Sequence, residues 1–433
     1  MSYSSELGLR VLLLVDCYCP SKKSSAKLIH DLAIELGRRG HQAIVMTPSE
    51  AISEIIEVCT EEGVCVVRLK TGRIKGATNV ARAFREALLP GTLWRGARNF
   101  LRQNSCDLIL FYSPTIFFGS LVRRLKQLWQ CPAYLILRDI FPDWALDTGV
   151  LRKGLVSQFF HRVAAQQYRI ADVIAVQSQA NLKYLARAFP QERLPLEVLF
   201  NWTALDESPL MQSNYRARLE LQDKIVFLYG GNLGVAQDMD NILRLAIRLA
   251  FRSDIHLLLV GEGSEVPRLK KSIETNGLRN LQIISGMAQQ DYLSMVSEFD
   301  VGLISLDARL MSHNIPGKLL GYLYWGKPAL ASVNPGNDLF WMLREHQAGL
   351  CLLNGDDDGL FDAALRLADD ARLRHAMGQN GRRLLEKKFS VEDAVTHIFK
   401  HLFERSLLPL SPNPQFASSE ILQFRAPELA AKR

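Results

Sequence analysis

The residues best suited to chemistry form a short segment around a Pro-Gly-Lys triplet, in the run Ser-His-Asn-Ile-Pro-Gly-Lys at 312–318. Pro316 fits the first turn of a helix, Gly317 lets a ligand approach the backbone, and Lys318 adds a positive charge beside free amides. This combination predicts a diphosphate site; a capped core helix with a surface lysine is the simpler alternative. The predicted phosphate-binding residues are His313, Asn314, Pro316, Gly317 and Lys318.

This segment is not a nucleoside-triphosphate loop, because it lacks the upstream glycine and the Ser or Thr that follows the lysine in such loops. Two other glycine-rich runs, Tyr-Gly-Gly-Asn-Leu-Gly at 229–234 and Val-Gly-Glu-Gly-Ser at 260–264, each follow a predicted strand. Glycines there let backbone amides face a phosphate. The second run looks like half a dinucleotide fingerprint and, without a third glycine, is weak support for NAD. The residues predicted to bind a phosphate-bearing ligand here are Gly230, Gly231, Asn232, Gly234, Gly261 and Glu262.

Acidic side chains supply the candidates for proton transfer. Arg138 and Asp139 close the apolar run at 133–137, so we expect both to emerge at the mouth of a cleft, where Asp139 could orient a sugar hydroxyl or accept a proton. An internal Arg–Asp pair or a helix cap is the alternative. Asp238 and Asp240 have the spacing of a metal-binding Asp-x-Asp, but their place in a predicted first helical turn favours capping, and we expect no metal.

The composition is typical of an ordinary α/β protein with two domains: 433 residues, of which 48% are apolar and 22% charged. The seven cysteines include no Cys-x-x-Cys pair, which favours reduced thiols in a cytoplasm. The longest apolar run, at 108–122, is interrupted by Ser, Pro and Gly. We therefore expect a cytoplasmic protein that neither spans a membrane nor is exported.

The net charge of +7 is concentrated in the N-terminal half, most densely in the segment 68–102. Its cations alternate with Phe, Leu and Trp, which predicts an amphipathic segment lying on the surface of an anionic bilayer. The alternative is a solvated basic face whose apolar side packs on its own domain. Nucleic acid is not expected, because no recognised binding module surrounds the patch. The cations are Arg68, Lys70, Arg73, Lys75, Arg82, Arg85, Arg95, Arg98 and Arg102.

The elements that must position these residues are short apolar runs alternating with helical patterns, which is typical of doubly wound parallel sheets. One series of strands is predicted at 10–15, 43–46, 64–69, 108–112, 133–137, 173–176 and 196–200, and a second at 225–229, 255–260, 281–284, 301–304, 328–331 and 350–353. The prediction is two Rossmann-like domains, residues 1–205 and 206–390, that face a central cleft. We expect a helix at 391–406 to cross back to the first domain, followed by a disordered tail at 407–433.

Taken in order, five stretches resemble the family 4 retaining glycosyltransferases. The likeness covers roughly residues 9–400 and is nearest to bacterial amino-sugar transferases of O-antigen and capsule assembly, including N-acetylfucosamine transferases. The stretches are Ser-Ser-Ala at 24–26 with Leu-Gly-Arg-Arg-Gly-His at 36–41, Arg-Asp-Ile-Phe-Pro-Asp at 138–143, Ala-Asp-Val-Ile-Ala-Val at 171–176 with Ser178, residues 227–237, and residues 315–332.

The resemblance implies a GT-B fold with the donor on the C-terminal domain, the acceptor on the N-terminal domain, and neither metal nor cofactor. Retaining transfer would occur on one face of the sugar without a protein nucleophile. By position, Lys318 would clamp phosphate, the 230–234 loop would line the diphosphate, and Asp139 would face the reacting sugar. Gly286 and Met287 would lie by the base. On the acceptor side we place Ser24, Ser25 and Arg138.

The function implied is transfer of a sugar, expected to be an N-acetylated amino sugar, from a UDP-sugar to a lipid-linked saccharide or lipopolysaccharide. The transfer would take place at the cytoplasmic face of the inner membrane. Two alternatives stay open: a non-catalytic GT-B partner of a polysaccharide assembly complex, and a UDP-sugar 2-epimerase. The epimerase is less favoured because we cannot place the paired acidic and histidine residues that it would need.

The sequence also departs from the family pattern. Asn232 stands where the wider family has an Arg and Gln237 where it has a Lys, although the resembled subgroup shares Asn-Leu-Gly. Gly321 stands where the family has the glutamate that binds the ribose hydroxyls. His313 stands where the family has the glutamate paired with it. The pair of glycines that the family has in its N-terminal domain is absent here, and Lys-Lys-Ser-Ser stands in its place at residues 22–25. The loss of the two cations at 232 and 237 leaves more of the charge to Lys318.

Overall fold

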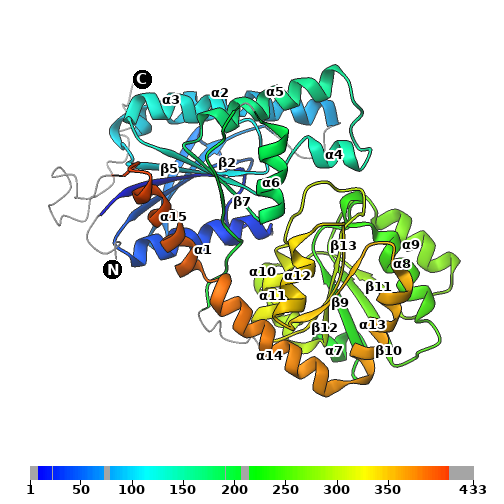
Figure 1. The fold of residues 1–433 in the computed structure, drawn as a ribbon. Helices are drawn as coiled ribbons and strands as arrows, with labels where there is room; N and C mark the ends of the chain where they lie inside the picture. The colour runs from blue at the N-terminus through cyan, green and yellow to red at the C-terminus, as the bar shows by residue number, and fades with distance from the viewer. Residues whose placement is uncertain (1–7, 22, 73–78, 191, 206–213, 409–433) are drawn as a thin grey trace.

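The computed structural model describes residues 8–21, 23–72, 79–190, 192–205 and 214–408, which form two α/β domains (Figure 1). Each domain is built on one sheet with helices on both faces. The fold class predicted from the alternating runs is thus confirmed. Among the described helices, none is both long enough and apolar enough to cross a bilayer.

The N-terminal sheet has eight strands in the order β3-β4-β2-β1-β5-β6-β7-β8. All pairs are parallel except β3 with β4. The edge strand β3 was missed by the sequence analysis, because its side chains are only partly buried and its apolar residues are mixed with Glu and Thr. The strands are β1 Arg10–Leu14, β2 Gln42–Ser49, β3 Ile56–Glu61, β4 Val64–Lys70, β5 Leu108–Ser113, β6 Ala133–Leu137, β7 Val173–Val176 and β8 Leu196–Val198.

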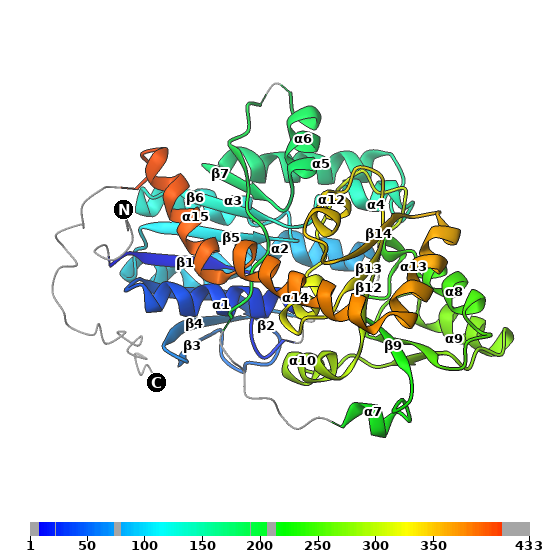
Figure 2. The same cartoon turned by 60° about the horizontal axis from the view of Figure 1, so that its bottom comes forward.

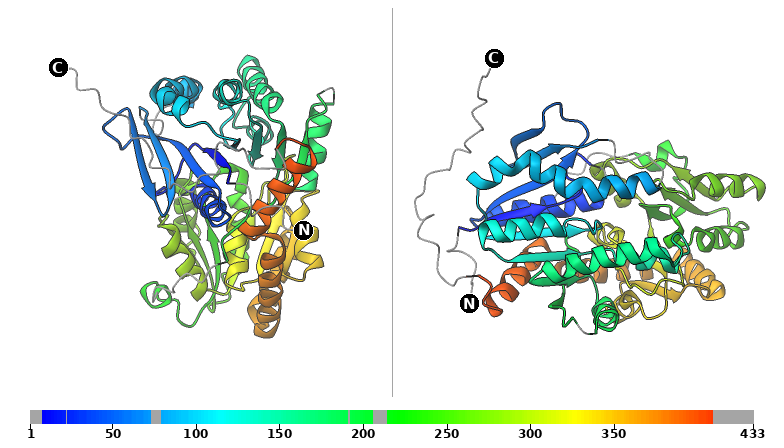
Figure 3. Two further views of the ribbon diagram at one scale, coloured as in Figure 1. Left: turned by 90° about the vertical axis from the view of Figure 1, so that its left-hand side faces the viewer. Right: turned by 90° about the horizontal axis from the view of Figure 1, so that it is seen from above.

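Helices cover both faces of this sheet, so its central strands are apolar throughout. Val11 and Leu13 face α1, whereas Leu12 and Leu14 face the layer of α2, α3 and α5, whose helices lie together in Figure 3. This alternation follows from the two-residue period of a strand. The helices are α1 Ser24–Arg38, α2 Asn79–Gln103, α3 Gly119–Trp129, α4 Asp143–Asp147, α5 Leu155–Ile170 and α6 Gln179–Ala188.

The C-terminal sheet has six parallel strands in the order β11-β10-β9-β12-β13-β14, all at predicted positions. One face packs on α8, α9 and α13, and the other on α10, α11, α12 and α14. The strands are β9 Ile225–Gly230, β10 Ile255–Val260, β11 Leu281–Ile284, β12 Val301–Ser305, β13 Ala329–Val333 and β14 Gly349–Leu353. The helices are α7 Tyr215–Arg218, η1 Val235–Gln237, α8 Met239–Arg248, α9 Val266–Thr275, α10 Gln289–Glu298, α11 Lys318–Tyr324, α12 Asp338–Glu345, α13 Asp357–Asp369, α14 Ala371–Lys388 and α15 Val391–Glu404.

The chain passes between the domains twice, and the two crossings are bonded to each other. Thr203 N donates to Phe389 O (2.9 Å), and Val391 N donates to Thr203 O (3.1 Å). Helices α14 and α15 follow one another across both domains (Figure 2). Arg39, which directly follows α1, fixes α15 through bonds to Thr396 Oγ1 (2.8 Å) and Glu392 O (2.6 Å). The predicted tail from 409 onward lies outside the described residues.

Candidate functional site

Two glycine loops meet backbone to backbone at the carboxyl ends of β9 and β10. A Cβ added to Gly261 would lie 1.8 Å from Gly231 O, and one added to Gly263 would lie 2.1 Å from Leu233 O. Any side chain at these positions would therefore force the two loops apart. Gly231 and Asn232 are exposed beside this contact, on the side where ligands bind in open α/β sheets.

Lys318 lies beside Gly231, which agrees with the arrangement that the family resemblance implies. Its Nζ is 3.2 Å from the centre of the Tyr229 ring and 3.9 Å from the position that a Cβ would take on Gly231. The cation thus rests on an aromatic face rather than in water. Burial lowers the pKa of Lys318 well below its usual value, so a bound anion would stabilise its charged form.

Helix α11 begins later than the sequence suggested. Its first residue is Lys318 and its N-cap is Gly317, so the expectation that Pro316 occupies the first turn is wrong. Pro316 instead precedes the helix, and its carbonyl accepts a hydrogen bond from Leu319 N (3.0 Å). The chain therefore turns at Pro316 and Gly317 before Lys318 enters the helix.

Asn232 and Gln237, which stand at positions where the wider family has cations, are bonded to each other. Asn232 Nδ2 donates to Gln237 Oε1 (2.9 Å), and the same oxygen accepts from Gly234 N (3.2 Å). This neutral pair fixes the shape of the 230–234 loop. Lys318 is consequently the cation that the structure places beside Gly231.

Glu262, Gly286 and Met287 form the neighbouring part of the same edge. A Cβ on Gly286 would lie 3.8 Å from Gly261 Cα and 3.9 Å from Glu262 Cγ. Glu262 is exposed, and its carbonyl accepts from Leu233 N (2.8 Å). The predicted base-side and phosphate-side residues therefore lie on one continuous edge of the C-terminal sheet.

His313 and Asn314, expected beside the phosphate, lie in contacts with the N-terminal domain. His313 N donates to Asn181 Oδ1 (2.6 Å), and Asn181 Nδ2 donates to Asn314 Oδ1 (3.1 Å). Asn314 Nδ2 in turn donates to Asp139 Oδ1 (3.3 Å). Both residues therefore help to hold the two domains together across the cleft, and their predicted role in donor binding stays a prediction.

The sequence analysis missed the N-terminal partners of this loop. Gln177 and Ser178 directly follow β7: Gln177 Oε1 accepts from Ile315 N (3.2 Å), and Ser178 Oγ donates to His313 O (2.8 Å). Ser178 also accepts from Asn181 N as the N-cap of α6. Polar residues after a buried parallel strand were the available signal, because such residues face the cleft.

Asp139 follows β6, is partly buried and accepts a hydrogen bond from Asn314 of the C-terminal domain. Burial raises the pKa of its carboxyl to about 6, and the negative charge of Asp16 adds to the effect. The hydrogen bond from Asn314 and the charge of Lys23 act in the opposite direction. Asp16 follows β1 and pairs with Lys23 (3.1 Å). Asp139 can therefore exchange a proton near neutral pH, which suits a group that contacts sugar hydroxyls.

Arg138, predicted beside Asp139 on the acceptor side, points the opposite way. Its Nη1 donates to Leu199 O (2.6 Å) and its Nη2 to Phe200 O (3.3 Å), with the guanidinium 5.4 Å from the Trp202 ring centre. The residue is only 3% exposed. The expectation that it emerges at the cleft is wrong, because consecutive residues of an extended strand project to opposite faces. Arg138 instead supports the chain crossing.

Of the two predicted serines, Ser24 borders the space between the domains. A hollow of about 250 Å³ is lined by α1 and α11 and includes Ser24, Gly317 and Gly321. A Cβ on Gly317 would lie 4.0 Å from Ser24 Oγ. Ser25 turns instead toward Cys17 Sγ, 3.2 Å away. The structure thus brings Ser24 and Gly317 together across the domain boundary.

The two aspartates predicted to cap a helix, Asp238 and Asp240, differ from Asp356, which accepts from Gly359 N (2.9 Å) and caps α13. Asp238 occupies the N-cap position of α8, but its carboxylate accepts from Asn354 Nδ2 (2.9 Å). Asp240 pairs with Arg268. Helix capping by these two aspartates was therefore wrong: each carboxylate bonds to a distant element.

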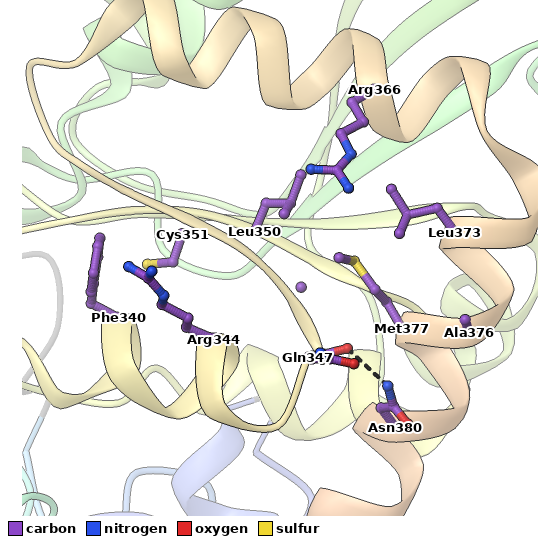
Figure 4. Close-up of a pocket in the computed structure, with 11 residues that line it drawn as sticks. Phe340, Arg344, Gln347, Leu350, Cys351, Arg366, Leu373, Ala376, Met377 and Asn380 are labelled. Carbon is purple, nitrogen blue, oxygen red and sulfur yellow. Dashed lines mark hydrogen bonds between the residues drawn. The ribbon is translucent and has the colours of Figure 1, made fainter.

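A larger hollow of about 400 Å³ lies elsewhere in the C-terminal domain, between α12, β14, α13 and α14 (Figure 4). Asn380 Nδ2 donates to Gln347 O (3.3 Å) at one side of it. None of its lining residues belongs to the loops described above, so it is not the candidate site. The lining residues are Phe340, Arg344, Gln347, Gly349, Leu350, Cys351, Arg366, Leu373, Ala376, Met377 and Asn380.

Comparisons with known proteins give matches in both halves of the chain. The glycosyl transferase 4-like domain matches residues 25–202, and glycosyl transferases group 1 matches residues 211–384. The lipopolysaccharide core biosynthesis glycosyltransferase LpsD of Rhizobium meliloti is 29% identical over 49% of this chain and 58% of its own length. The putative colanic acid biosynthesis glycosyl transferase WcaI of Escherichia coli is 24% identical over 54% and 59%. The chain thus spans less than two thirds of these relatives.

Solved structures match over nearly the whole chain. Sucrose-phosphate synthase from Thermosynechococcus elongatus has a TM-score of 0.72 at 15% identity, covering 92% of this chain and 100% of that chain. The crystal structure of Anabaena HepE in complex with UDP-glucose has a TM-score of 0.69 at 16% identity, with the same coverage. These likenesses show the fold. With glycosyltransferase models matched in both domains and the GT-B architecture confirmed, the chain belongs to the group 1 glycosyltransferases and has a glycosyltransferase 4-like N-terminal domain.

Proposed function

We propose that this protein transfers a sugar, expected to be an N-acetylated amino sugar, from a UDP-linked donor to a lipid-linked saccharide or lipopolysaccharide, with retention and without a metal. The observation that carries the proposal is the placement of Lys318 beside Gly231, at the start of a helix whose preceding loop is bonded through Asn314 to Asp139 of the N-terminal domain. The printed names of relatives in lipopolysaccharide core and colanic acid biosynthesis support the acceptor class. HepE, solved with UDP-glucose, supports the donor class.

The diphosphate is the ligand that best matches the C-terminal wall. A diphosphate bound beside the exposed Gly231 would lie close to Lys318 and restore the positive charge that burial disfavours. As the bond to the sugar breaks, negative charge grows on the leaving phosphate, and Lys318 would stabilise it most at that point. Because Asn232 and Gln237 are neutral, the stabilisation of this negative charge would depend on Lys318.

Asp139 is the group on the opposite wall that we propose to contact the reacting sugar. Its bond to Asn314 links it to the loop that precedes Lys318, so closure of the cleft positions both residues together. An aspartate held near its titration point can accept a hydroxyl hydrogen bond and share its proton. The non-catalytic alternative is retained only because Gly321 and His313 replace the family glutamates.

The membrane contact is better placed on α5 than on the segment 68–102. In that segment Leu93, Ala97 and Phe100 are buried in the domain core, and Arg68 pairs with Glu61. Arg73, Lys75 and the side chain of Arg82 lie outside the described residues. The start of α5, by contrast, exposes an apolar patch made of Val150, Leu155, Val156 and Phe159, next to Arg152 and Lys153.

This apolar patch lies near the cleft, because Asp147 of the preceding helix accepts from Met311 N (2.9 Å) in the interdomain loop. Apolar side chains flanked by cations suit the interface of an anionic bilayer. We therefore place the protein on the cytoplasmic face of the inner membrane, where a lipid-linked acceptor would reach the cleft.

Replacing Lys318 with Met should lower turnover about 100-fold, since loss of a contact made to the transition state costs about 3 kcal/mol. Met keeps the length of the side chain over Tyr229 but carries no charge. The measurement is UDP release from a panel of UDP-sugars in the presence of membrane lipid extract. Lys270→Met, on the exposed face of α9, is the matched control and should keep wild-type turnover. Wild-type turnover in a folded Lys318→Met variant would rule out this role.

Replacing Asp139 with Asn should stabilise the protein at neutral pH. The folded-state pKa of about 6 exceeds the unfolded value near 4, so stability falls as the pH rises between them. Well above pH 6 the full penalty, on the order of 3 kcal/mol, is present. Urea unfolding should therefore show the variant to be more stable than wild type at about pH 7.5, with the difference shrinking toward pH 4. A pH-independent difference would contradict the assigned titration.

Replacing Leu155 and Phe159 with Ser should weaken binding to vesicles that contain phosphatidylglycerol, because two exposed apolar contacts are lost. Both side chains are at least half exposed, so the fold should persist. Cosedimentation measures the bound fraction. The comparison variant carries Arg95→Ser, Arg98→Ser and Arg102→Ser on the exposed face of α2. If only this triple variant detaches, the contact lies on α2, and the placement on α5 is refuted.

A further inference from the structure

A compact group of metal-binding side chains lies far from the cleft, where α15 packs on the N-terminal sheet. It consists of Glu197 on β8 and of His397 and His401 on α15 (Figure 1 shows the helix against this domain). The two histidines are four residues apart, so they lie on one face of the helix. One ligand atom from each of the three residues lies within 4.8 Å of the others.

The separations match the spacing of ligands around one metal ion as well as that of His–Glu ion pairs. His401 Nδ1 is 3.0 Å from Glu197 Oε2, and His397 Nε2 is 3.5 Å from Glu197 Oε1. Ligands 2.0–2.1 Å from a tetrahedral zinc ion are about 3.4 Å apart, which these two distances bracket. Within the described part of the chain, Glu197 Oε2 and His397 Nε2 have no hydrogen-bond partner despite being buried.

The glutamate is also held in the way that metal-binding carboxylates are held. Its side chain is only 4% exposed, and Tyr134 on β6 donates its hydroxyl hydrogen bond to Oε1. Such second-shell bonds orient a ligand and keep it in place. The imidazoles of His397 and His401 are 34% and 29% exposed, which leaves an approach for an ion and room for water as a fourth ligand.

We propose that Glu197, His397 and His401 bind a divalent transition-metal ion, of which Zn²⁺ is the best match. Two imidazoles and one carboxylate are ligands that zinc prefers, whereas Mg²⁺ and Ca²⁺ prefer oxygen alone. The ion would join α15 to β8, residues that are 200 positions apart in the sequence. Its role is structural: it would fasten the C-terminal helix to the N-terminal domain, beside the bonds made by Arg39.

The inference does not depend on the proposed transferase activity, and its test uses zinc alone. The full chain is stripped with EDTA, its thiols are blocked with N-ethylmaleimide because seven free cysteines could bind zinc, and Zn²⁺ is titrated by calorimetry. One site per chain is expected in wild type. His397→Gln and His401→Gln should each weaken that site at least about tenfold. Both side chains are partly exposed, so these variants should fold.

The matched control is His375→Gln on α14, an exposed histidine that contacts Gln379 and no second histidine. It should keep the zinc affinity of wild type. As a second readout, zinc should slow the amide hydrogen exchange of α15 in wild type and leave it unchanged in His401→Gln. Absence of a zinc site in wild type, or equal zinc affinity in wild type and both variants, would overturn the proposal.

Discussion

The hydrogen bonds between the 311–315 loop and the strand ends of the N-terminal domain set the geometry of the cleft. Through them Gln177, Ser178 and Asn181 fix the loop that leads directly into α11. Lys318 is the first residue of that helix, so its position relative to Asp139 depends on these bonds. Any change in the angle between the domains must break or move them. The two halves of the candidate site are therefore assembled by the same contacts that join the domains.

Glycine is required where the loops that follow β9 and β10 approach each other most closely. Gly231 and Gly261 touch through their backbones, which brings the ends of β9 and β10 together, and within the 230–234 loop Gly231 and Asn232 are exposed. Arg138, Trp202 and the 199–203 segment then support the chain crossing from the N-terminal side. The site is thus built on rigid strand ends, which suits a reaction that depends on the stabilisation of developing charge.

The sequence predicted the strands and the glycine loops well, because both signals are local. Buried parallel strands are continuous apolar runs, and the glycines that follow β9 and β10 are recognisable from the sequence alone. The edge strand β3 was missed because its side chains are partly or fully exposed and its apolar residues are mixed with Glu and Thr. The placement of Lys318 beside Gly231 agrees with the arrangement that the family resemblance implies.

What could not be predicted depends on contacts between distant segments. Whether Arg138 or Asp139 faces the cleft is set by the pleat of β6, and the sequence treats the two residues alike. The bond from Asn232 to Gln237 depends on how one loop folds back on itself. Glu197 lies 200 residues before His397, so no spacing rule reveals that group. The exposed residues of α5 likewise become distinct only when the burial of α2 is known.

The central claim, that the cleft binds the diphosphate of a nucleotide-sugar without a metal, is tested most directly by calorimetric titration of the protein with UDP in EDTA. GDP and NAD serve as comparison ligands in the same buffer. Micromolar binding of UDP alone, weakened in Lys318→Met, is the predicted result. Absence of UDP binding in the folded wild-type protein would contradict the claim and would favour a non-catalytic role for this GT-B chain.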